Sequence, residues 1–283
     1  MREKIIRAIV EGNFLQKTYD KAKEIFFNCF NGVYRKRFLK KIDMVMAKHA
    51  RKKIIVNTKV ENDKIMFTTF SGSYNCNPKA ILEEILRQHL PWKLVWVGKS
   101  KDLKRLEQFP PSVKIVLWES LEFYQEAASS KIWICNSTYL TSLNLRKKEE
   151  QKFIQTWHGS LGLKKFETNQ NQKWIQNGLL DGARTDYCIS NSTFENDLYK
   201  STFWKTADIL TYGHPRNDIL LTGDQKKISK IQKKVRVGLN IPEGIKVALY
   251  APTFRDDKSL APYSLNYEGL REALRQRFGG EWL

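Results

Sequence analysis

Residues Phe153-Ile154-Gln155-Thr156-Trp157-His158-Gly159-Ser160-Leu161-Gly162-Leu163-Lys164-Lys165 place a histidine and two glycines directly after a short apolar run. The apolar run predicts a buried strand, and the glycines after it let backbone N–H groups approach a ligand closely. A histidine with an ordinary pKa of about 6.5 can accept a proton at cellular pH. With the amides of Gly159 and Ser160 and the two lysines that follow, the stretch suits transfer of a phosphorylated group to a hydroxyl. A strand-end turn with a solvated lysine pair fits the same pattern, and a lone His-Gly pair does not decide between them.

Strands and helices alternate on both sides of this stretch. Apolar runs predict strands over 53–56, 65–68, 94–97, 113–116, 132–135, 186–190 and 208–212, with helices over 79–90 and 120–129. Asn77 and Pro78 suit the N-cap and the first position of the helix over 79–90. Short loops between alternating strands and helices predict a parallel sheet covered on both faces. Polar residues end each run, at the edge where open α/β sheets bind ligands.

Composition limits the class of protein. The chain has 283 residues, 41% of them hydrophobic, which suits one large domain or two modest ones. It carries 49 lysines and arginines against 30 aspartates and glutamates, a formal net charge of +19. This balance predicts an anionic partner: nucleic acid, an acidic membrane surface or a phosphate-rich substrate. The four cysteines have no metal-binding or disulfide spacing and predict reduced residues of an intracellular protein: Cys29, Cys76, Cys135 and Cys188.

Residues 1–50 form a basic segment that also contains aromatic residues, with twelve lysines and arginines against five acidic residues. Ile42, Val45 and Met46 keep helical spacing, and Phe38 and Leu39 extend the same face. Such amphipathic helices can lie in the headgroup layer of an anionic membrane, or can pack an apolar face on the domain behind them. The sequence shows neither a signal peptide nor an apolar run of about 18 residues, the length a spanning helix needs.

Two motifs follow the expected sheet. Gly213-His214-Pro215-Arg216-Asn217-Asp218 predicts a turn at Gly213 and a helix that begins near Pro215, with Asp218 in its first turn. Arg216 suits either a phosphate clamp or a structural partner for Asp218. His214 reads as a packed loop histidine in preference to a catalyst. Residues 225–236 predict a basic linker helix, and residues 247–250 predict a strand whose loop carries Thr253, Arg255 and Asp256 towards an interdomain cleft.

Four motifs in one order resemble the CDP-glycerol glycerophosphotransferases: Asn77-Pro78-Lys79, Gln155-Thr156-Trp157-His158-Gly159-Ser160, Gly213-His214-Pro215-Arg216-Asn217-Asp218 and Tyr250-Ala251-Pro252-Thr253-Phe254-Arg255-Asp256-Asp257. The resemblance covers about residues 50–283 and implies an α/β fold of the GT-B type, two Rossmann-like domains facing a cleft. It implies peripheral enzymes at the cytoplasmic face of the cell membrane that build teichoic-acid-like polymers. It makes His158 the candidate base.

The reaction that this family carries out transfers glycerol phosphate from CDP-glycerol to a hydroxyl of a lipid-linked glycerol phosphate or glycan acceptor and releases CMP. The resemblance therefore implies CDP-glycerol as the donor substrate, an anionic membrane surface as a partner, and no separate cofactor or metal. Contacts to the substrate or its phosphates are then expected from Gly159, Ser160, Lys164, Lys165, Arg216, Asp218, Thr253, Arg255 and Asp256.

The chain also departs from the family pattern. The family commonly has proline soon after the His-Gly pair, where this chain has Leu161-Gly162-Leu163, and a residue other than histidine at position 214. After the expected strand near residue 250 only one clear helix, about 267–278, remains. One strand and one helix bury too little surface for a second Rossmann-like domain, so this domain is expected to be incomplete and the chain inactive by itself.

The expected organisation is therefore basic amphipathic helices over 1–50, a Rossmann-like domain over 51–222, and a linker helix with an incomplete donor-binding domain over 223–283. Two other functions stay open at this point. One is a GT-B sugar transferase that uses a nucleotide sugar. The other is a basic, non-catalytic nucleic-acid binder, although the positive charge is dispersed and no nucleic-acid-binding motif stands out.

Overall fold

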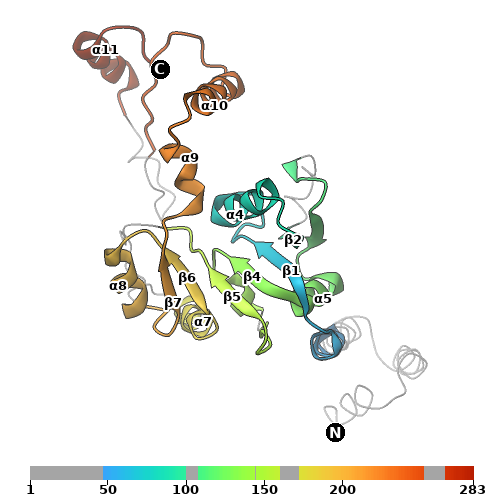
Figure 1. The fold of residues 1–283 in the computed structure, drawn as a ribbon. Helices are drawn as coiled ribbons and strands as arrows, with labels where there is room; N and C mark the ends of the chain where they lie inside the picture. The colour runs from blue at the N-terminus through green and yellow to red at the C-terminus, as the bar shows by residue number, and fades with distance from the viewer. Residues whose placement is uncertain (1–46, 100–107, 144, 160–171, 252–264) are drawn as a thin grey trace, which may run out of the picture. The chain divides into compact units, whose positions relative to one another are not determined.

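The computed structural model describes residues 47–99, 108–143, 145–159, 172–251 and 265–283, and the chain divides into two compact units, Met1–Asp218 and Ile219–Leu283. The first unit contains a sheet of seven parallel strands in the order β3-β2-β1-β4-β5-β6-β7 (Figure 1). The parallel sheet that the sequence predicts is thus confirmed. The strands are β1 (Glu61–Thr68), β2 (Lys93–Gly98), β3 (Lys114–Leu117), β4 (Ser130–Cys135), β5 (Lys152–Gln155), β6 (Tyr187–Ser190) and β7 (Asp208–Thr211).

The central strand β1 sends alternate side chains to opposite faces of the sheet, as the period of two along a strand requires. Ile65 and Phe67 pack with Leu82 and Ile85 of α4 (Cys76–Arg87) on one face. Met66 lies in a cluster on the other face, together with residues of α5 (Leu121–Ser129). Both faces of the sheet are therefore covered, which explains why its strands read as almost continuous apolar runs.

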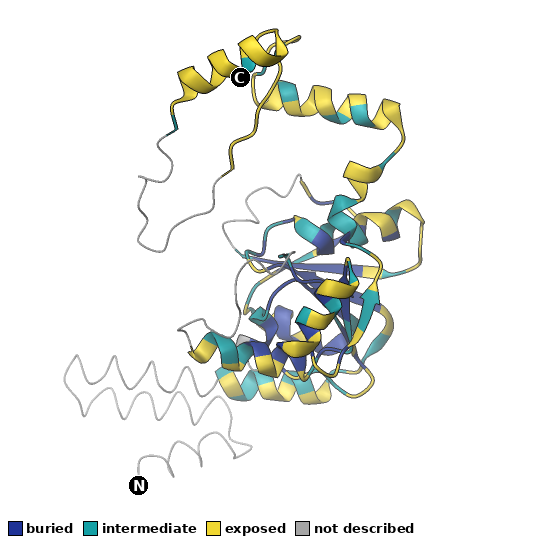
Figure 2. Cartoon of the chain, turned by 90° about the vertical axis from the view of Figure 1, so that its left-hand side faces the viewer, coloured by how far each residue is buried: buried dark blue, intermediate teal, exposed yellow. Residues whose placement is uncertain are grey.

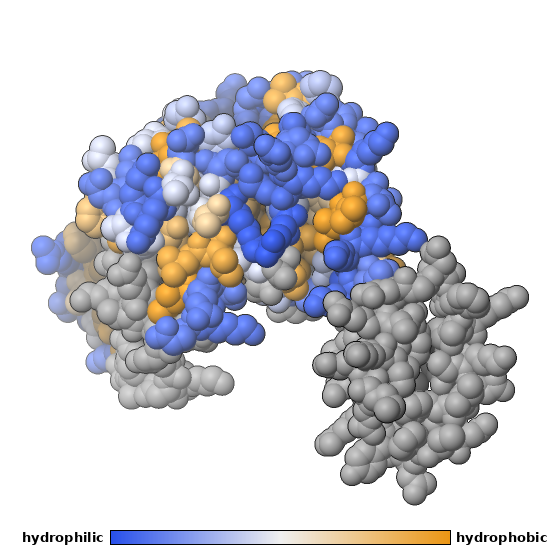
Figure 3. Space-filling view, turned by 90° about the horizontal axis from the view of Figure 1, so that it is seen from below, coloured by the Kyte–Doolittle hydropathy of each residue, from blue (hydrophilic) through white to orange (hydrophobic). Residues whose placement is uncertain are grey.

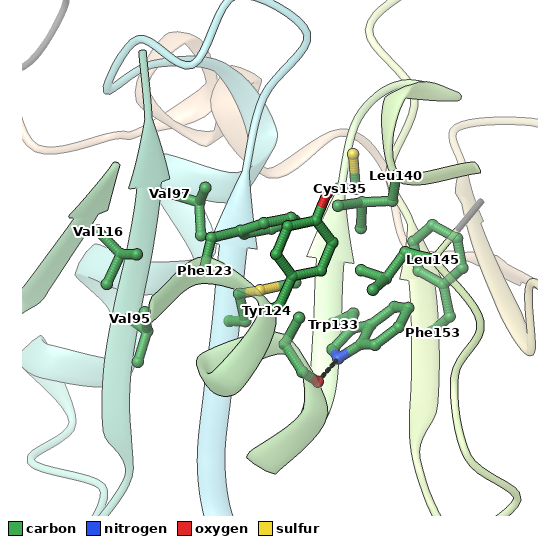
Figure 4. Packing of buried hydrophobic residues seen from close by; sticks show 12 residues of the cluster. Val95, Val97, Val116, Phe123, Tyr124, Trp133, Cys135, Leu140, Leu145 and Phe153 are labelled. Carbon is green, nitrogen blue, oxygen red and sulfur yellow. Dashed lines mark hydrogen bonds between the residues drawn. The ribbon is translucent and has the colours of Figure 1, made fainter. Parts of the chain in front are cut away.

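Figure 4 shows the cluster on the α5 face, in which Phe123 and Tyr124 lie between Val97 and Trp133. The indole N–H of Trp133 donates a 2.8 Å hydrogen bond to the carbonyl oxygen of Ala127, so this buried polar group is satisfied. Ser120, the N-cap of α5, accepts a hydrogen bond from the backbone N–H of Phe123, which fixes the helix start near the predicted position.

The prediction of a strand over 53–56 is wrong, because residues 47–57 are helical. Ile54 and Ile55 pack against the cluster on the α5 face, and the neighbouring charged residues face outward. A short apolar run does not distinguish a strand from a buried helix turn, and here packing decided the outcome. The expected helices over 1–46 lie outside the described residues.

Helices that the sequence did not reveal complete the first unit: α6 (Tyr139–Ser142), α7 (Gln172–Gly182) and α8 (Thr193–Ser201). Trp174 and Ile175 of α7 and Tyr199 of α8 pack with Trp204 in a third apolar cluster under β6 and β7. After β7, Gly213 adopts a φ of +86°, and the chain enters the 3₁₀ helix η2 (Pro215–Asn217). The predicted turn at Gly213 and helix start at Pro215 are confirmed.

Asn77 is not the N-cap of α4, contrary to the sequence prediction. The helix begins at Cys76, so the preceding Asn75 occupies the cap position and Asn77 lies inside the first turn. The side chain of Asn77 is fully buried and bonds to backbone carbonyls near the end of β5. The Asn77 side chain, which the sequence predicted to cap the helix, instead makes a tertiary contact with the backbone of Thr156 and Trp157.

The second unit contains α10 (Gln225–Gly238) and α11 (Tyr267–Phe278), as the sequence predicts, preceded by the short helix α9 (Asp218–Leu221). Both long helices are largely exposed (Figure 2). The predicted strand over 247–250 is wrong for the described residues, where only Lys246 forms a bridge, to Trp282, and Leu249 is 88% exposed. A strand needs a ladder of partners, and the described residues supply only 281–283.

The described surface seen in Figure 3 is mostly hydrophilic, with apolar residues in small separate patches. Among the described helices, none combines the length and the apolar character required to cross a membrane.

Candidate active site

The carboxyl ends of the parallel strands bring together the polar residues of the candidate site. His158 lies three residues beyond the end of β5, and the loops after β1, β4 and β7 lie beside it. Trp157, between the strand and His158, has a φ of +47°, a left-handed conformation that a bulky side chain adopts only when its surroundings enforce it. After this turn the His158 ring lies against Asn136 and Phe70, which follow β4 and β1.

The imidazole of His158 is oriented by a backbone carbonyl. Its Nδ1 lies 2.6 Å from the carbonyl oxygen of Asn136, at the end of β4. A carbonyl oxygen can only accept, so Nδ1 carries the proton and donates it. Nε2 is therefore left with a lone pair, and no described residue is hydrogen-bonded to it. Phe70 stacks on one face of the ring at 5.3 Å between centroids, which fixes the plane of the imidazole.

Burial lowers the pKa of His158 below its ordinary value, because the charged imidazolium loses hydration. The hydrogen bond to Asn136 opposes this effect, whereas the positive charge of Arg216 lowers the pKa further. His158 is consequently neutral at pH 7, with its basic nitrogen unprotonated. This is the state that a general base requires.

Arg216 reaches His158 from η2. One of its guanidinium nitrogens donates to the carbonyl oxygen of His158 at 2.9 Å and to Sγ of Cys76 at 3.0 Å. No ion pair joins Arg216 to Asp218 within the described part of the chain, so the structural partner considered from the sequence is not the one observed. Asp218 does occupy the predicted first turn of a helix, α9.

Asn77 connects three loops at the edge of the sheet. Its Nδ2 donates to the carbonyl oxygens of Thr156 and Trp157 at 3.0 and 3.2 Å, while its Oδ1 accepts from the backbone N–H of Arg216 at 3.2 Å. The same Nδ2 lies 3.4 Å from Nδ1 of His214. Removal of this one side chain would take a hydrogen-bond partner from each of these three backbone groups.

His214 is a packed histidine, as its sequence context indicates. It is 2% exposed, and its Nε2 lies 3.1 Å from a carboxylate oxygen of the buried Glu195. Because Nδ1 faces the amide N–H of Asn77, Nε2 is the nitrogen that donates to Glu195. Glu195 also accepts from the backbone N–H of Asn191 at 2.7 Å. His214 therefore links the buried Glu195 to Asn77, which in turn bonds to the backbone before His158.

The structure thus brings together His158 and Arg216, with Gly159 next along the chain. A Cβ at Gly159 would lie 3.3 Å from the Trp157 indole nitrogen, which is a close contact. The other predicted phosphate contacts lie outside the described residues: Ser160, Lys164, Lys165, Thr253, Arg255 and Asp256.

Sequence reasoning missed Asn136, Phe70 and Glu195. Asn136 directly follows the predicted strand over 132–135, a position that marks it as a residue of the ligand-binding edge. Its Oδ1 accepts from the backbone N–H of Phe70 at 2.9 Å, and its buried Nδ2 has no partner among the described residues. Glu195 follows Ser192 in a Ser-x-x-Glu pattern that marks the start of α8, but this pattern does not reveal its bond to His214, 19 positions away.

The family model of the CDP-glycerol:poly(glycerophosphate) glycerophosphotransferases matches residues 50–283. The chain belongs to this family. Among curated relatives of these glycerophosphotransferases, the teichoic acid poly(glycerol phosphate) polymerase of Staphylococcus epidermidis is 33% identical over 211 residues, 70% of this chain. The teichoic acid poly(glycerol phosphate) polymerase of Bacillus subtilis (strain 168) is 29% identical over 238 residues, 79% of this chain.

Solved structures of a member of the family confirm the α/β, GT-B-like fold class. The wall teichoic acid polymerase TagF is similar at a TM-score of 0.67 and 28% identity, over 87% of this chain and 62% of that one. A TagF variant soaked with CDPG is similar at a TM-score of 0.66. The chain spans 28% of the length of the S. epidermidis polymerase and 31% of that from B. subtilis.

Proposed function

We propose that this glycerophosphotransferase transfers glycerol phosphate from CDP-glycerol to a hydroxyl of a membrane-linked acceptor in teichoic acid or related polymer synthesis. The observation that carries the proposal is the neutral His158, whose Nδ1 is held by Asn136 and whose Nε2 has no partner among the described residues. A base in this state at the ligand-binding edge of a family member is what the reaction needs.

In the proposed reaction the acceptor oxygen attacks the β-phosphorus of CDP-glycerol, and the bond from that phosphorus to the CMP oxygen breaks. The acceptor O–H proton passes to Nε2 of His158, and the electron pair of the broken bond leaves with CMP. The proton on Nδ1 stays bonded to the Asn136 carbonyl, which stabilises the imidazolium as it forms. General base catalysis of this kind contributes typically ~10²–10⁴ in rate.

The leaving CMP requires neutralisation of its charge more than protonation. The amides of Gly159 and Ser160, together with Lys164, Lys165, Thr253 and Arg255, are the groups proposed to contact the phosphates, and Asp256 is proposed to contact another part of the substrate. Arg216 is proposed to position His158, because its guanidinium donates a hydrogen bond to the His158 carbonyl oxygen. Its positive charge also lowers the pKa of the imidazole. Asp218 is proposed to stabilise the start of α9 after this arginine.

The test is release of CMP from CDP-glycerol, with a lipid-linked glycerol phosphate acceptor, by a purified protein that carries this chain together with a complete donor-binding domain. We expect acceptor-dependent CMP release that is lost in His158→Gln and retained in His89→Asn. His89 is exposed and has a φ of +53°, a conformation that asparagine tolerates. Transfer from UDP-glucose in place of CDP-glycerol would overturn the donor assignment in favour of a sugar transferase.

We further propose that residues 1–50 attach the protein to the anionic cytoplasmic face of the membrane. The support is their composition, because each lysine or arginine near such a surface contributes about 1 kcal/mol. The test is co-sedimentation with vesicles containing phosphatidylglycerol, with and without residues 1–46, at low and high salt. Binding that is unchanged by the deletion would show that the segment only packs on the fold.

A further inference from the structure

A buried carboxylate is linked by hydrogen bonds to the turn that precedes the candidate base. Asp181, in the last turn of α7, is fully buried and accepts three side-chain hydrogen bonds. The donors are Thr141 Oγ1 at 2.9 Å, Gln155 Nε2 at 2.8 Å and Trp204 Nε1 at 3.4 Å. Burial raises the pKa of Asp181 to about 6, whereas the hydrogen bonds from Gln155, Thr141 and Trp204 oppose this shift because they favour the ionised carboxylate. A charge kept in an apolar interior needs these donors, and the donors in turn are oriented by the charge.

The carboxylate determines which way the amide of Gln155 points. Nε2 of Gln155 donates to Asp181 and to the carbonyl oxygen of Ser137, so Oε1 must face the opposite side. A flipped amide would place Oε1 against the negative charge of Asp181 and a second oxygen. The flipped state is therefore unfavourable for as long as Asp181 is present.

The oriented Oε1 accepts the backbone N–H of Trp157 at 3.0 Å. This contact holds Trp157 in its left-handed conformation, while Asn77 binds the carbonyl of the same residue. Without an acceptor, the Trp157 N–H would be a buried donor next to a strained backbone, and the turn would relax. The next residue along the chain is His158.

The rest of α7 keeps Asp181 in place. A Cβ at Gly182 would lie 1.7 Å from the backbone oxygen of Phe203, so the end of α7 packs directly on the chain that carries Trp204. A Cβ at Gly178 would likewise meet the Phe203 ring at 2.6 Å. The end of α7, which carries Asp181, is therefore held closely against the segment around Phe203.

We propose that Asp181 is a positioning residue for His158, acting through the side-chain amide of Gln155 and the backbone N–H of Trp157. The proposal rests on the proposed function only for the role of His158. Asp181 touches neither the base nor, on this account, the substrate. Its effect is to hold the turn that aims the imidazole at the Asn136 carbonyl.

The test measures the His158 ring directly, by ¹⁵N NMR of histidine-labelled protein with the His158 signals assigned from His158→Gln. In the unsubstituted protein we expect one tautomer, protonated at Nδ1. In Gln155→Leu and Asp181→Ala we expect mixed tautomers and a pKa that moves up towards the ordinary histidine value, because the ring leaves its buried position. In Asp181→Asn, which can still accept from Gln155, we expect the Nδ1 tautomer to persist.

The matched control is Thr141→Val, which removes a hydrogen bond to Asp181 without touching the path to Trp157. It should lower stability while leaving the His158 signals unchanged. If Gln155→Leu and Asp181→Ala fold and show the His158 signals of this control, the proposal is wrong. Should Asp181→Ala fail to fold, Gln155→Leu and Gln155→Met decide the question, since both keep the side-chain volume.

Kinetics supply a second readout that a purely structural role would not move. We expect Gln155→Leu to lower kcat by tenfold to about a hundredfold with KM for CDP-glycerol unchanged, as a displaced base would. An equal loss in Thr141→Val would overturn the proposal. If a protein that carries this chain together with a complete donor-binding domain shows no transfer from CDP-glycerol at all, the proposed function fails, whereas the NMR comparison still tests the positioning of His158.

Discussion

Nδ1 of His158 lies 2.6 Å from the carbonyl oxygen of Asn136, so the tautomer of the candidate base is set by the backbone at the end of a neighbouring strand. The two residues are 22 positions apart and meet because β4 and β5 are adjacent and parallel. The arrangement leaves the lone pair of Nε2 for a substrate proton, and it does so without a carboxylate partner for the ring among the described residues.

In a protein that carries this chain together with a complete donor-binding domain, replacement of His158 by glutamine should lower acceptor-dependent CMP release at least ~10²-fold, because the base that takes the acceptor proton is lost. Binding of CDP-glycerol, measured by calorimetry, should persist. His89→Asn is the matched control and should retain full activity. A His158→Gln protein within about threefold of the unsubstituted rate would remove His158 from the reaction.

Arg216→Met should raise the pKa of His158, because the arginine charge lowers that pKa in the unsubstituted protein. The measurement is an NMR titration of the imidazole. The acidic limb of the kcat/KM profile should move to higher pH in the same direction, since the base works only when unprotonated. Lys200→Met, on the exposed end of α8, is the control for loss of one positive charge and should leave the titration unchanged.

Asn77→Ala should destabilise the first unit by about 1–3 kcal/mol, because the carbonyls of Thr156 and Trp157 lose a buried donor. The measurement is the urea midpoint followed by tryptophan fluorescence. Asn75→Ala is the control, because Asn75 is exposed and its side chain makes no capping hydrogen bond. Equal midpoints for the two variants would contradict the role assigned to Asn77.

Asp181→Asn should change the pH dependence of stability with a definite sign. The pKa of Asp181 is raised on folding from 3.8 to about 6, so the folded state holds this proton more tightly than the unfolded state. The stability that Asp181 contributes therefore falls as pH rises from 3.8 to 6 and levels off above that range. The difference in Tm, unsubstituted minus Asp181→Asn, should decrease over this window. A difference that is constant or increases with pH would contradict a raised pKa for this group.

The sequence alone determined the parallel sheet, because its strands are buried on both faces and each therefore appears as a short apolar run between turn residues. It also determined where α5 and α11 lie, since Ser120 and Asn266 cap these helices through contacts three residues away. It singled out His158 by its position after a buried strand. These features depend on neighbours along the chain.

The tertiary structure decided the features that depend on residues distant in the sequence. Ile54 and Ile55 lie in a helix, because in this conformation they pack against the apolar cluster on the α5 face of the sheet. Asn77 became a support of the turn at Trp157, 80 positions away, and Asp181 became the acceptor for Gln155, 26 positions away. A local pattern can show that a polar side chain is placed among apolar ones, but only the packing of strands and helices supplies the partner that satisfies it.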